Sequence, residues 1–186
     1  MRIKDINIVN FKGFQNETVV FNGNLTVVIG NNTAGKTTLL KAIQVGLGAY
    51  LQSLKQLPGG APYRRNFSSL DKFMRFDEEL RDYIPNYEKP RITINADFPV
   101  TQSLCDNCPK VSFVPVHWYR EFAGNYTTHT RACAGELIDA VHQMESLRYD
   151  EKQESVYPLV LAFGAKRTSD SQAKSTSNVK ERASRI

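Results

Sequence analysis

Apolar residues are spaced like β-strands over the first thirty positions of the chain. Isolated isoleucines mark residues 3–8, and two apolar runs follow at 18–21 and 25–29. Lys12-Gly13-Phe14 and Asn22-Gly23-Asn24 separate these segments, and Asn-Gly in particular favours a hairpin turn. The run at 25–29 is continuously apolar, which predicts a strand that is buried on both faces.

The period changes to that of a helix after Gly35. Apolar residues then recur every three or four positions, at Leu39, Leu40, Ile43, Leu47, Tyr50 and Leu51. This spacing predicts a helix over residues 36–55, which Pro58-Gly59-Gly60 would end. Residues 58–90 are rich in proline, glycine and charge, and are predicted to be an insertion or loop region with a short helix around residues 70–80.

The second half of the chain alternates strand-like and helix-like patterns. Residues 91–98 predict a strand, and residues 111–119 a hairpin partner for it, which Pro115 assigns to the edge of a sheet. A helix is expected over 136–147, followed by a buried strand at 158–164. Residues 1–165 are thus predicted to form one lobe of α/β class, and 166–186 a mobile basic Ser- and Lys-rich segment.

Composition excludes several classes of protein. The 186 residues are 41% hydrophobic, 10% aromatic and 23% charged, which is typical of a chain that folds around a core and not of a disordered or collagen-like chain. No apolar run approaches the roughly 20 residues that span a bilayer, and no secretory signal precedes the first strand. Three cysteines do not make a disulfide framework, so we expect a cytoplasmic protein without a membrane partner.

The net charge of +5 comes mostly from the C-terminal segment. Residues 166–186 hold six basic and two acidic residues, which leaves the rest of the chain close to neutral. The basic character therefore describes a short tail and not a basic face. A solvated tail and a contact with a nucleic-acid backbone both remain open for it.

One segment carries a strong chemical signal. It is Gly30-Asn31-Asn32-Thr33-Ala34-Gly35-Lys36-Thr37, followed by Thr38. The segment matches G-x-x-x-x-G-K-[ST], the P-loop, and it has the predicted strand before it and the predicted helix after it that this motif requires. A simple connecting loop is the alternative, and the context on both sides disfavours it.

Each residue type in the loop suits a nucleotide phosphate. The glycines allow a tight turn whose N–H groups point into one concave nest, and the following helix start favours anions. Lys36 would lie between the β- and γ-phosphates, the Thr37 hydroxyl would complete the Mg²⁺ shell, and Thr38 would reach the α-phosphate. The sequence therefore predicts binding of ATP with Mg²⁺, with Lys36 and Thr37 as catalytic candidates.

The sequence around the P-loop resembles the N-terminal half of ABC-type ATPases of the SMC/RecF/OLD group. In that group an I-x-N-F-(K/R)-x-F strand pair precedes the loop, and residues 6–14 here are Ile-Asn-Ile-Val-Asn-Phe-Lys-Gly-Phe. The resemblance covers residues 1–50. It implies an ABC-type nucleotide-binding lobe, in which an antiparallel β-layer lies beside the P-loop sheet and helix.

By the same resemblance, Lys12 and Phe14 lie beside the nucleotide. Lys12 would touch phosphate or ribose, and Phe14 would pack near the base. From the residues alone, Phe14 equally suits the core of the strand pair, and Lys12 equally suits a solvated turn.

A second resemblance lies at residues 157–167. Tyr-Pro-Leu-Val-Leu-Ala-Phe-Gly-Ala-Lys-Arg is similar to the P-L-(hydrophobic)-Y-Y-G-x-x-R strand of anti-phage ATPases, such as the Septu and retron-associated ones that work with an HNH nuclease. Ala162-Phe163 replaces the tyrosine pair of that pattern. The resemblance implies ATP hydrolysis in a head-to-head dimer, within a nuclease-linked defence or DNA repair complex that contacts DNA or RNA.

Motifs that complete an ABC-type active site do not occur in these 186 residues. There is no Ser-Gly-Gly signature, and Asp77-Glu78-Glu79 follows Arg75-Phe76 instead of an apolar strand. Without an acid pair, Mg²⁺ lacks a second protein anchor and the attacking water lacks a base. We therefore expect this chain alone to be inactive as an ATPase, and a longer protein to supply the other half.

Two alternatives from other functional classes stay open. One is a nucleotide sensor without turnover, and the other is the ATPase subunit of a membrane transporter. Transporter ATPases usually place an aromatic residue that stacks on adenine before the P-loop, and a Gln after the helix. The Asn-Phe-Lys-Gly-Phe sequence at 10–14 favours the nuclease-linked class instead.

Weaker signals come from cysteine, histidine and aromatic residues. Cys105 and Cys108 have C-x-x-C spacing, but the further ligands that zinc needs, among Cys133, His117, His129 and His142, are not paired at short spacing. Two reduced cysteines in a turn are the simpler interpretation. Residues 117–120, His-Trp-Tyr-Arg, suit either stacking on a base or an aromatic edge strand that packs into the core. Arg64, Arg65 and Arg148 are most simply surface charges.

Overall fold

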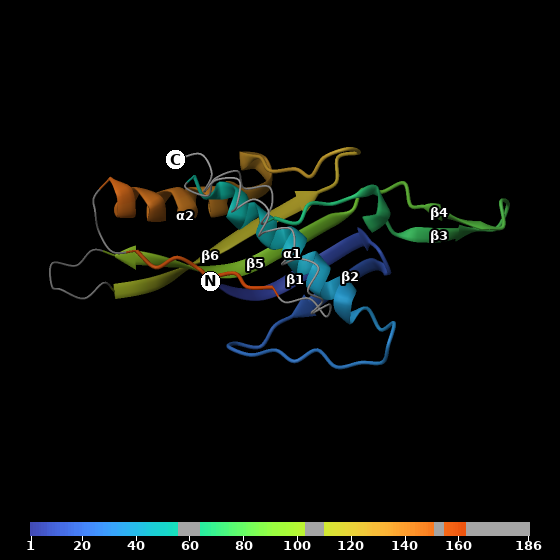
Figure 1. Ribbon diagram of the computed structural model, residues 1–186, viewed down its shortest axis with the longest axis horizontal. Coiled ribbons are helices and arrows are strands. Elements are labelled where there is room, and N and C mark those ends of the chain that lie inside the picture. The colour runs from blue at the N-terminus through green and yellow to red at the C-terminus, as the bar shows by residue number, and fades with distance from the viewer. Residues whose placement is uncertain (56–63, 103–109, 151–154, 163–186) are drawn as a thin grey trace, which may run out of the picture.

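The computed structural model describes residues 1–55, 64–102, 110–150 and 155–162. Its centre is a four-stranded antiparallel sheet in the order β2-β1-β5-β6. Two helices, α1 and α2, lie against one face of this sheet, and a separate two-stranded hairpin projects away from it (Figure 1). This arrangement confirms the predicted α/β class.

The first hairpin joins β1 (Arg2–Phe11) to β2 (Phe14–Val20). Phe11 is opposite Phe14, so Lys12 and Gly13 form a two-residue turn, and Phe14, which the sequence placed in the connection, is the first residue of β2. Lys12 has a positive φ of 52°, the left-handed conformation that favoured two-residue hairpin turns require. The main chain of the turn therefore adopts a left-handed conformation at Lys12.

The long strands β5 (Arg91–Gln102) and β6 (Lys110–Glu121) form the other half of the sheet. They pair from Arg91↔Glu121 to Gln102↔Lys110, which confirms the predicted hairpin and its edge position. Alternate side chains of β1, β5 and β6 point to the helix side and are buried there, namely Ile6, Ile8, Ile92, Ile94, Ala96, Phe98, Val116 and Trp118. This alternation is the pattern of a sheet with one buried face.

Helices α1 (Lys36–Ser53) and α2 (Arg131–Tyr149) cover that face. Both predicted helices are confirmed, and α2 begins five residues earlier than its apolar spacing indicated. α1 packs closely because Gly46 faces β5, where a Cβ atom would lie 2.3 Å from Ile94 Cδ1. Trp118 on β6 donates its indole N–H to the Gly46 carbonyl at 2.9 Å, which joins the helix to the sheet.

Arg120 is a second link between β6 and α1. Its guanidinium is 1% exposed and donates to the carbonyls of Val45 at 2.8 Å and Arg65 at 3.1 Å, and to Asn66 Oδ1 at 2.8 Å. Burial, followed by the charge of Arg64, lowers the pKa of Arg120 to about 10. Carbonyl dipoles thus balance a buried cation at the centre of the molecule.

The region expected to hold a short helix has a different structure. A 3₁₀ turn at Ser69–Asp71 leads into the hairpin of β3 (Met74–Asp77) and β4 (Asp82–Pro85). Phe76 and Tyr83 are opposite each other, with ring centroids 5.3 Å apart. The prediction of a helix around 70–80 is wrong, because the apolar residues there alternate along two strands that pair with each other.

Two predicted buried strands are also wrong. Residues 25–29 and 155–162 form no strand in the structure, and their apolar side chains are largely exposed, as at Ile29 (88%) and Leu159 (81%). Both segments have strand-like composition, but no strand of the described chain pairs with them. Only Tyr157 and Val160 of the second segment pack on the core.

Several sequence predictions concern residues outside those that the structure describes. These are the tail at 166–186, the end of the predicted helix at 58–60, the end of the predicted strand at 163–164, and the Cys105–Cys108 pair. In the described parts of the chain, no helix is long and apolar enough to span a bilayer.

Candidate nucleotide-binding site

The predicted P-loop lies at the exposed N-terminal end of α1. Gly35 has a φ of 84° and directly precedes the first helical residue, Lys36, and the Leu39 amide donates to the Gly35 carbonyl at 2.9 Å. Residues 31–34 are exposed, and the first turn of α1 contains no acidic residue. The helix start therefore presents its unpaired amides and the positive end of its dipole without a carboxylate to compete with an anion.

The Lys36 side chain folds back over the loop. Its ammonium donates to the Asn31 carbonyl at 2.6 Å and also to the Gly30 carbonyl. Thr33 has a φ of 74°, and its hydroxyl donates to the Asn32 carbonyl. The loop is thus curled around the lysine ammonium, which places a positive charge beside the main chain that the motif assigns to phosphate.

The remaining P-loop residues follow in α1. Thr37 is exposed, and Thr38 is half-buried in the first helical turn. The Thr37 hydroxyl is a hard oxygen donor of the kind that Mg²⁺ accepts. The described residues contain no group of three or more His, Cys, Asp or Glu side chains that could hold a metal by themselves. Thr37 and the phosphates of a nucleotide would therefore have to share the ion with water or further ligands.

Phe14 lies directly against the loop. A Cβ atom at Gly35 would lie 2.9 Å from Phe14 Cζ, and only glycine tolerates both this contact and the positive φ. Phe14 also packs against the hydrophobic core. The structure thus brings together two predicted site residues, Phe14 and Gly35, that are 21 positions apart in the sequence.

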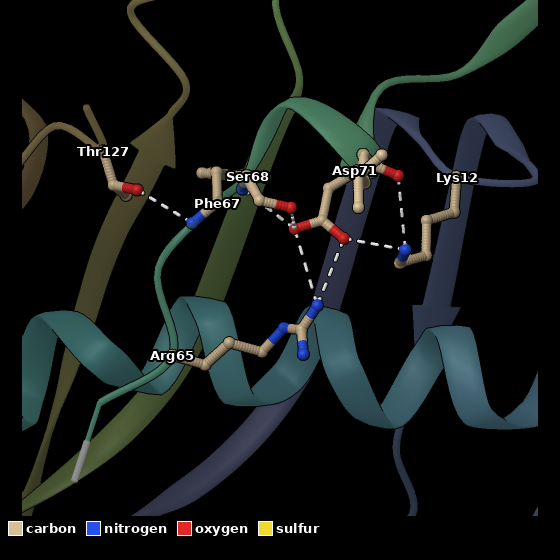
Figure 2. Close-up of polar contacts among 7 residues, drawn as sticks. Lys12, Arg65, Phe67, Ser68, Asp71 and Thr127 are labelled. Atoms are coloured by element: carbon tan, nitrogen blue, oxygen red, sulfur yellow. Dashed lines mark hydrogen bonds and ion pairs between the residues drawn. The ribbon is translucent and has the colours of Figure 1, made fainter. Parts of the chain in front are cut away.

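Lys12 contacts a part of the chain that the sequence did not point to. Its ammonium forms an ion pair with Asp71 Oδ1 at 2.8 Å and donates to the Leu70 carbonyl at 3.4 Å. Its main-chain N–H donates to the Asp71 carbonyl at 2.8 Å. Figure 2 shows the Lys12 side chain reaching toward Asp71 at the end of the 3₁₀ turn.

The Asp71 carboxylate is 1% exposed and has several donors. Arg65 Nη2 lies 3.1 Å from Oδ1, and Ser68 donates its amide at 3.0 Å and its hydroxyl at 3.1 Å to Oδ2 (Figure 2). Burial by itself would raise the pKa of Asp71, but hydrogen bonds from Lys12 and Ser68 outweigh it and hold this pKa below its ordinary value. Asp71 is therefore an ionised, buried junction between the Lys12 turn and the segment 65–71.

Sequence reasoning missed this junction. It described Arg65 as a surface charge, whereas the structure pairs Arg65 with a buried acid. The local signal is the capping pattern Ser68-x-x-Asp71, in which Ser68 and Asp71 bond to each other's main chain or side chain around the short 3₁₀ turn. That pattern predicts a turn, but it does not predict a partner at Lys12.

Three other candidates that the structure describes lie away from the P-loop. Trp118 is fully buried in the core, so the core packing alternative is correct for it and stacking on a base is not. Cys133 is buried at the start of α2 and accepts a hydrogen bond from the Thr130 hydroxyl at 3.2 Å. His142 lines a small cavity near the C-terminal end of α2.

Comparison with known proteins relates this chain to ATPases. A family profile described as an AAA ATPase domain matches residues 1–184. The retron Ec83 probable ATPase of Escherichia coli is 45% identical over 49 residues, which cover 25% of this chain and 9% of that protein. The DNA double-strand break repair Rad50 ATPase of Sulfolobus acidocaldarius is 43% identical over 47 residues, which cover 25% of this chain and 5% of that protein.

A solved structure from work on ATP-driven dimerisation and DNA-stimulated activation of SMC ATPases was also matched. The match covers 96% of this chain and 99% of that chain, at 16% identity and a TM-score of 0.46. The matches to the two curated relatives cover only a small part of the length of each, 9% and 5%.

Proposed function

Because the chain belongs to the AAA ATPase domain family, we propose that residues 30–38 bind the phosphates of ATP together with Mg²⁺. In this proposal the main-chain amides of the loop and the start of α1 surround the phosphate oxygens. Lys36 provides the charge that the β- and γ-phosphates need, and Thr37 provides one oxygen ligand to Mg²⁺. Lys12 and Phe14 form the neighbouring edge of the site.

One observation carries the proposal. The exposed loop curls around the Lys36 ammonium directly before the first turn of α1, where no acidic side chain competes for the positive end of the helix. An anion with several oxygens suits such a place, because it would accept from the ammonium and from successive amides at once. Mg²⁺ bound with the phosphates would offset part of their charge.

The proposal extends to hydrolysis within a larger assembly. The apolar segments 25–29 and 155–162 form no strand and lack strand partners among the described residues. A sheet completed by further chain, or by a second subunit, would cover them. We propose that hydrolysis takes place in such a head-to-head dimer, and that the assembly acts with a nuclease on DNA or RNA. The similarity to a retron ATPase and to a DNA repair ATPase supports this extension.

A titration with ATP and Mg²⁺ tests the binding site. We expect Lys36→Ala in the full chain to lose on the order of 2–4 kcal/mol of nucleotide affinity, which is about 30- to 1,000-fold. Lys41→Ala is the matched control, because it removes the same charge one turn further along α1. Equal affinity of wild type and Lys36→Ala would contradict the proposed site.

The role of Thr37 is tested by metal dependence. Wild type should bind ATP more tightly with Mg²⁺ than with EDTA, and Thr37→Ala should lose much of that difference while it keeps the binding seen in EDTA. Thr37→Ser retains the hydroxyl and should retain the metal dependence. A Thr37→Ala variant with unchanged metal dependence would remove Thr37 from the Mg²⁺ shell.

A further inference from the structure

The buried carboxylate of Asp71 is a costly feature that the P-loop motif does not explain. A side chain with 1% exposure keeps a negative charge only when hydrogen-bond donors replace the water it has lost. Lys12 supplies one of these donors from the turn after β1, and Arg65 and Ser68 supply the others from the segment that contains Asp71 itself. Such an arrangement rigidifies whatever it holds together.

Asp71 binds both the side chain and the main chain of Lys12. The carboxylate binds the Lys12 ammonium, and the Asp71 carbonyl accepts the Lys12 main-chain N–H. A third bond, from the Phe73 amide to the Asn10 carbonyl at 3.0 Å, ties the two segments together on the other side. The turn at the end of β1 is therefore fixed by residues about sixty positions later in the sequence.

This turn is connected to the P-loop through Phe14. Lys12 lies two residues before Phe14, and the Phe14 ring packs against Gly35, next to Lys36. A change in the conformation of the Lys12–Gly13 turn would therefore move the ring that supports the second P-loop glycine. Asp71 contacts Lys12, the chain continues through Gly13 to Phe14, and the Phe14 ring lies against Gly35.

The charges at the junction also suit an anionic ligand. One carboxylate faces two cations, Lys12 and Arg65, so the group as a whole keeps a positive charge. An ammonium has three N–H donors, and the contacts with Asp71 and Leu70 account for two of them. The third donor leaves Lys12 able to bind a further acceptor without giving up Asp71.

We propose that Asp71 is a positioning residue of the nucleotide site and that it acts through Lys12. Its carboxylate holds the Lys12 turn, and thereby Phe14, in the conformation that supports the P-loop for phosphate binding. The inference rests on the proposed function, and it adds the segment 65–73 to the structure that shapes the site.

A double-mutant cycle in the full chain tests the inference. The affinity for ATP with Mg²⁺ is measured for wild type, Asp71→Asn, Lys12→Ala and the double variant. Asparagine keeps the size of the side chain and still accepts a bond from Ser68. We expect Asp71→Asn to weaken binding about three- to tenfold in the wild-type background and less than about twofold in the Lys12→Ala background, because residues that act through one another are not additive.

Asp77→Asn is the matched control. Asp77 pairs with Arg75 and accepts from the amides of Glu79 and Leu80 on the projecting hairpin, away from Lys12. It should leave nucleotide affinity within about twofold of wild type. The amide signal of Gly35 in the ligand-free protein provides a second measurement, which Asp71→Asn should shift and Asp77→Asn should not.

Two results would overturn the inference. One is an unchanged affinity in Asp71→Asn, and the other is an equal loss with and without Lys12. If Asp71→Asn does not fold, Asp71→Glu in the same cycle keeps the charge but moves it, and the same dependence on Lys12 is expected. Wild-type binding that is lost in Lys36→Ala, combined with a silent Asp71→Asn, would reject this inference while the proposed function stands.

Discussion

Strand β5 and the segment 25–29 have similar apolar character but opposite environments. In β5, Ile92, Ile94 and Phe98 are fully buried. In the other segment, Leu25 is 78% exposed and Ile29 is 88% exposed. β5 pairs with β1 on one side and with β6 on the other, whereas no strand of the described chain pairs with the segment 25–29.

The difference shows that an apolar run needs partners to become a strand. Strand pairing satisfies main-chain donors and acceptors, and a covering layer removes the side chains from water. β5 has both, because α1 and α2 lie over its buried face. The segment 25–29 has the sequence of a strand, but no described strand pairs with it and no described layer buries its side chains.

Replacement of the same residue type in the two regions should give the largest contrast. We expect Ile94→Ala to lower the free energy of unfolding by about 2–5 kcal/mol, because it leaves a cavity between β5 and α1. Ile29→Ala should change it by less than about 0.5 kcal/mol, since that side chain is already in water. Denaturant unfolding of both variants measures this. Similar losses would mean that residues 25–29 are packed in solution and would break the comparison.

A smaller effect tests how closely α1 approaches the sheet. Gly46→Ala would place a Cβ atom 2.3 Å from Ile94 Cδ1 and 3.3 Å from Ile92 Cγ2. Overpacking costs about 1–3 kcal/mol, and the better helix propensity of alanine returns up to about 1 kcal/mol, so we expect a net loss of about 1–2 kcal/mol.

Gly135→Ala is the control for this variant. Gly135 lies in α2, and a Cβ atom there would meet no other heavy atom within 4 Å. The substitution should therefore be neutral or stabilising by up to about 1 kcal/mol. Equal thermal stability of Gly46→Ala and wild type would show that α1 can move away from β5 at little cost.

The fold was predictable where the signals are local. The helical spacing of Leu39, Ile43 and Leu47 identified α1, and the strand-like runs on either side of residues 12–14 indicated β1 and β2. The Asn22-Gly23 pair was the stronger hairpin signal, but it joins no two strands in the structure. The hairpin of β3 and β4 was not predicted, because its short strands alternate over only four residues each. Strand-like runs also do not reveal whether a partner strand exists, which explains the error at 25–29.

The candidate site likewise has one part that the sequence predicted and another that it did not. The P-loop is contiguous, so the sequence alone places Gly35, Lys36 and Thr37 at a helix start. The contact between Lys12 and Asp71 joins residues 59 positions apart and depends on how the segment 64–73 folds back over β1. Arg120 illustrates the same limit, because a buried arginine held by carbonyls leaves no pattern in the sequence.

The smallest expected effect is a dependence of the free energy of unfolding on pH that comes from the half-buried His129. Burial, followed by the charges of Arg120 and Arg64, lowers the pKa of His129 from 6.5 to about 4. Between these two values the unfolded chain takes up a proton that the folded chain refuses. Above about pH 6.5 His129 therefore does not lower the free energy of unfolding. As the pH drops toward 4, its protonation in the unfolded chain lowers this free energy.

His129→Gln should reduce this pH dependence. The shift would correspond to about 3 kcal/mol for a fully buried group, but His129 is only half-buried, and solvent screening reduces the expected effect to about 1 kcal/mol. Unfolding free energies at pH 7 and pH 5 measure it, with His142→Gln as a control at the other end of α2. Because Asp71 has a pKa below its ordinary value near 4, its own contribution is lost only at lower pH. If the free energy of unfolding depended on pH equally in His129→Gln and in wild type, water would reach the region around Arg120 and Arg64. The contrast between the buried β5 region and the exposed segment 25–29 would then be weaker.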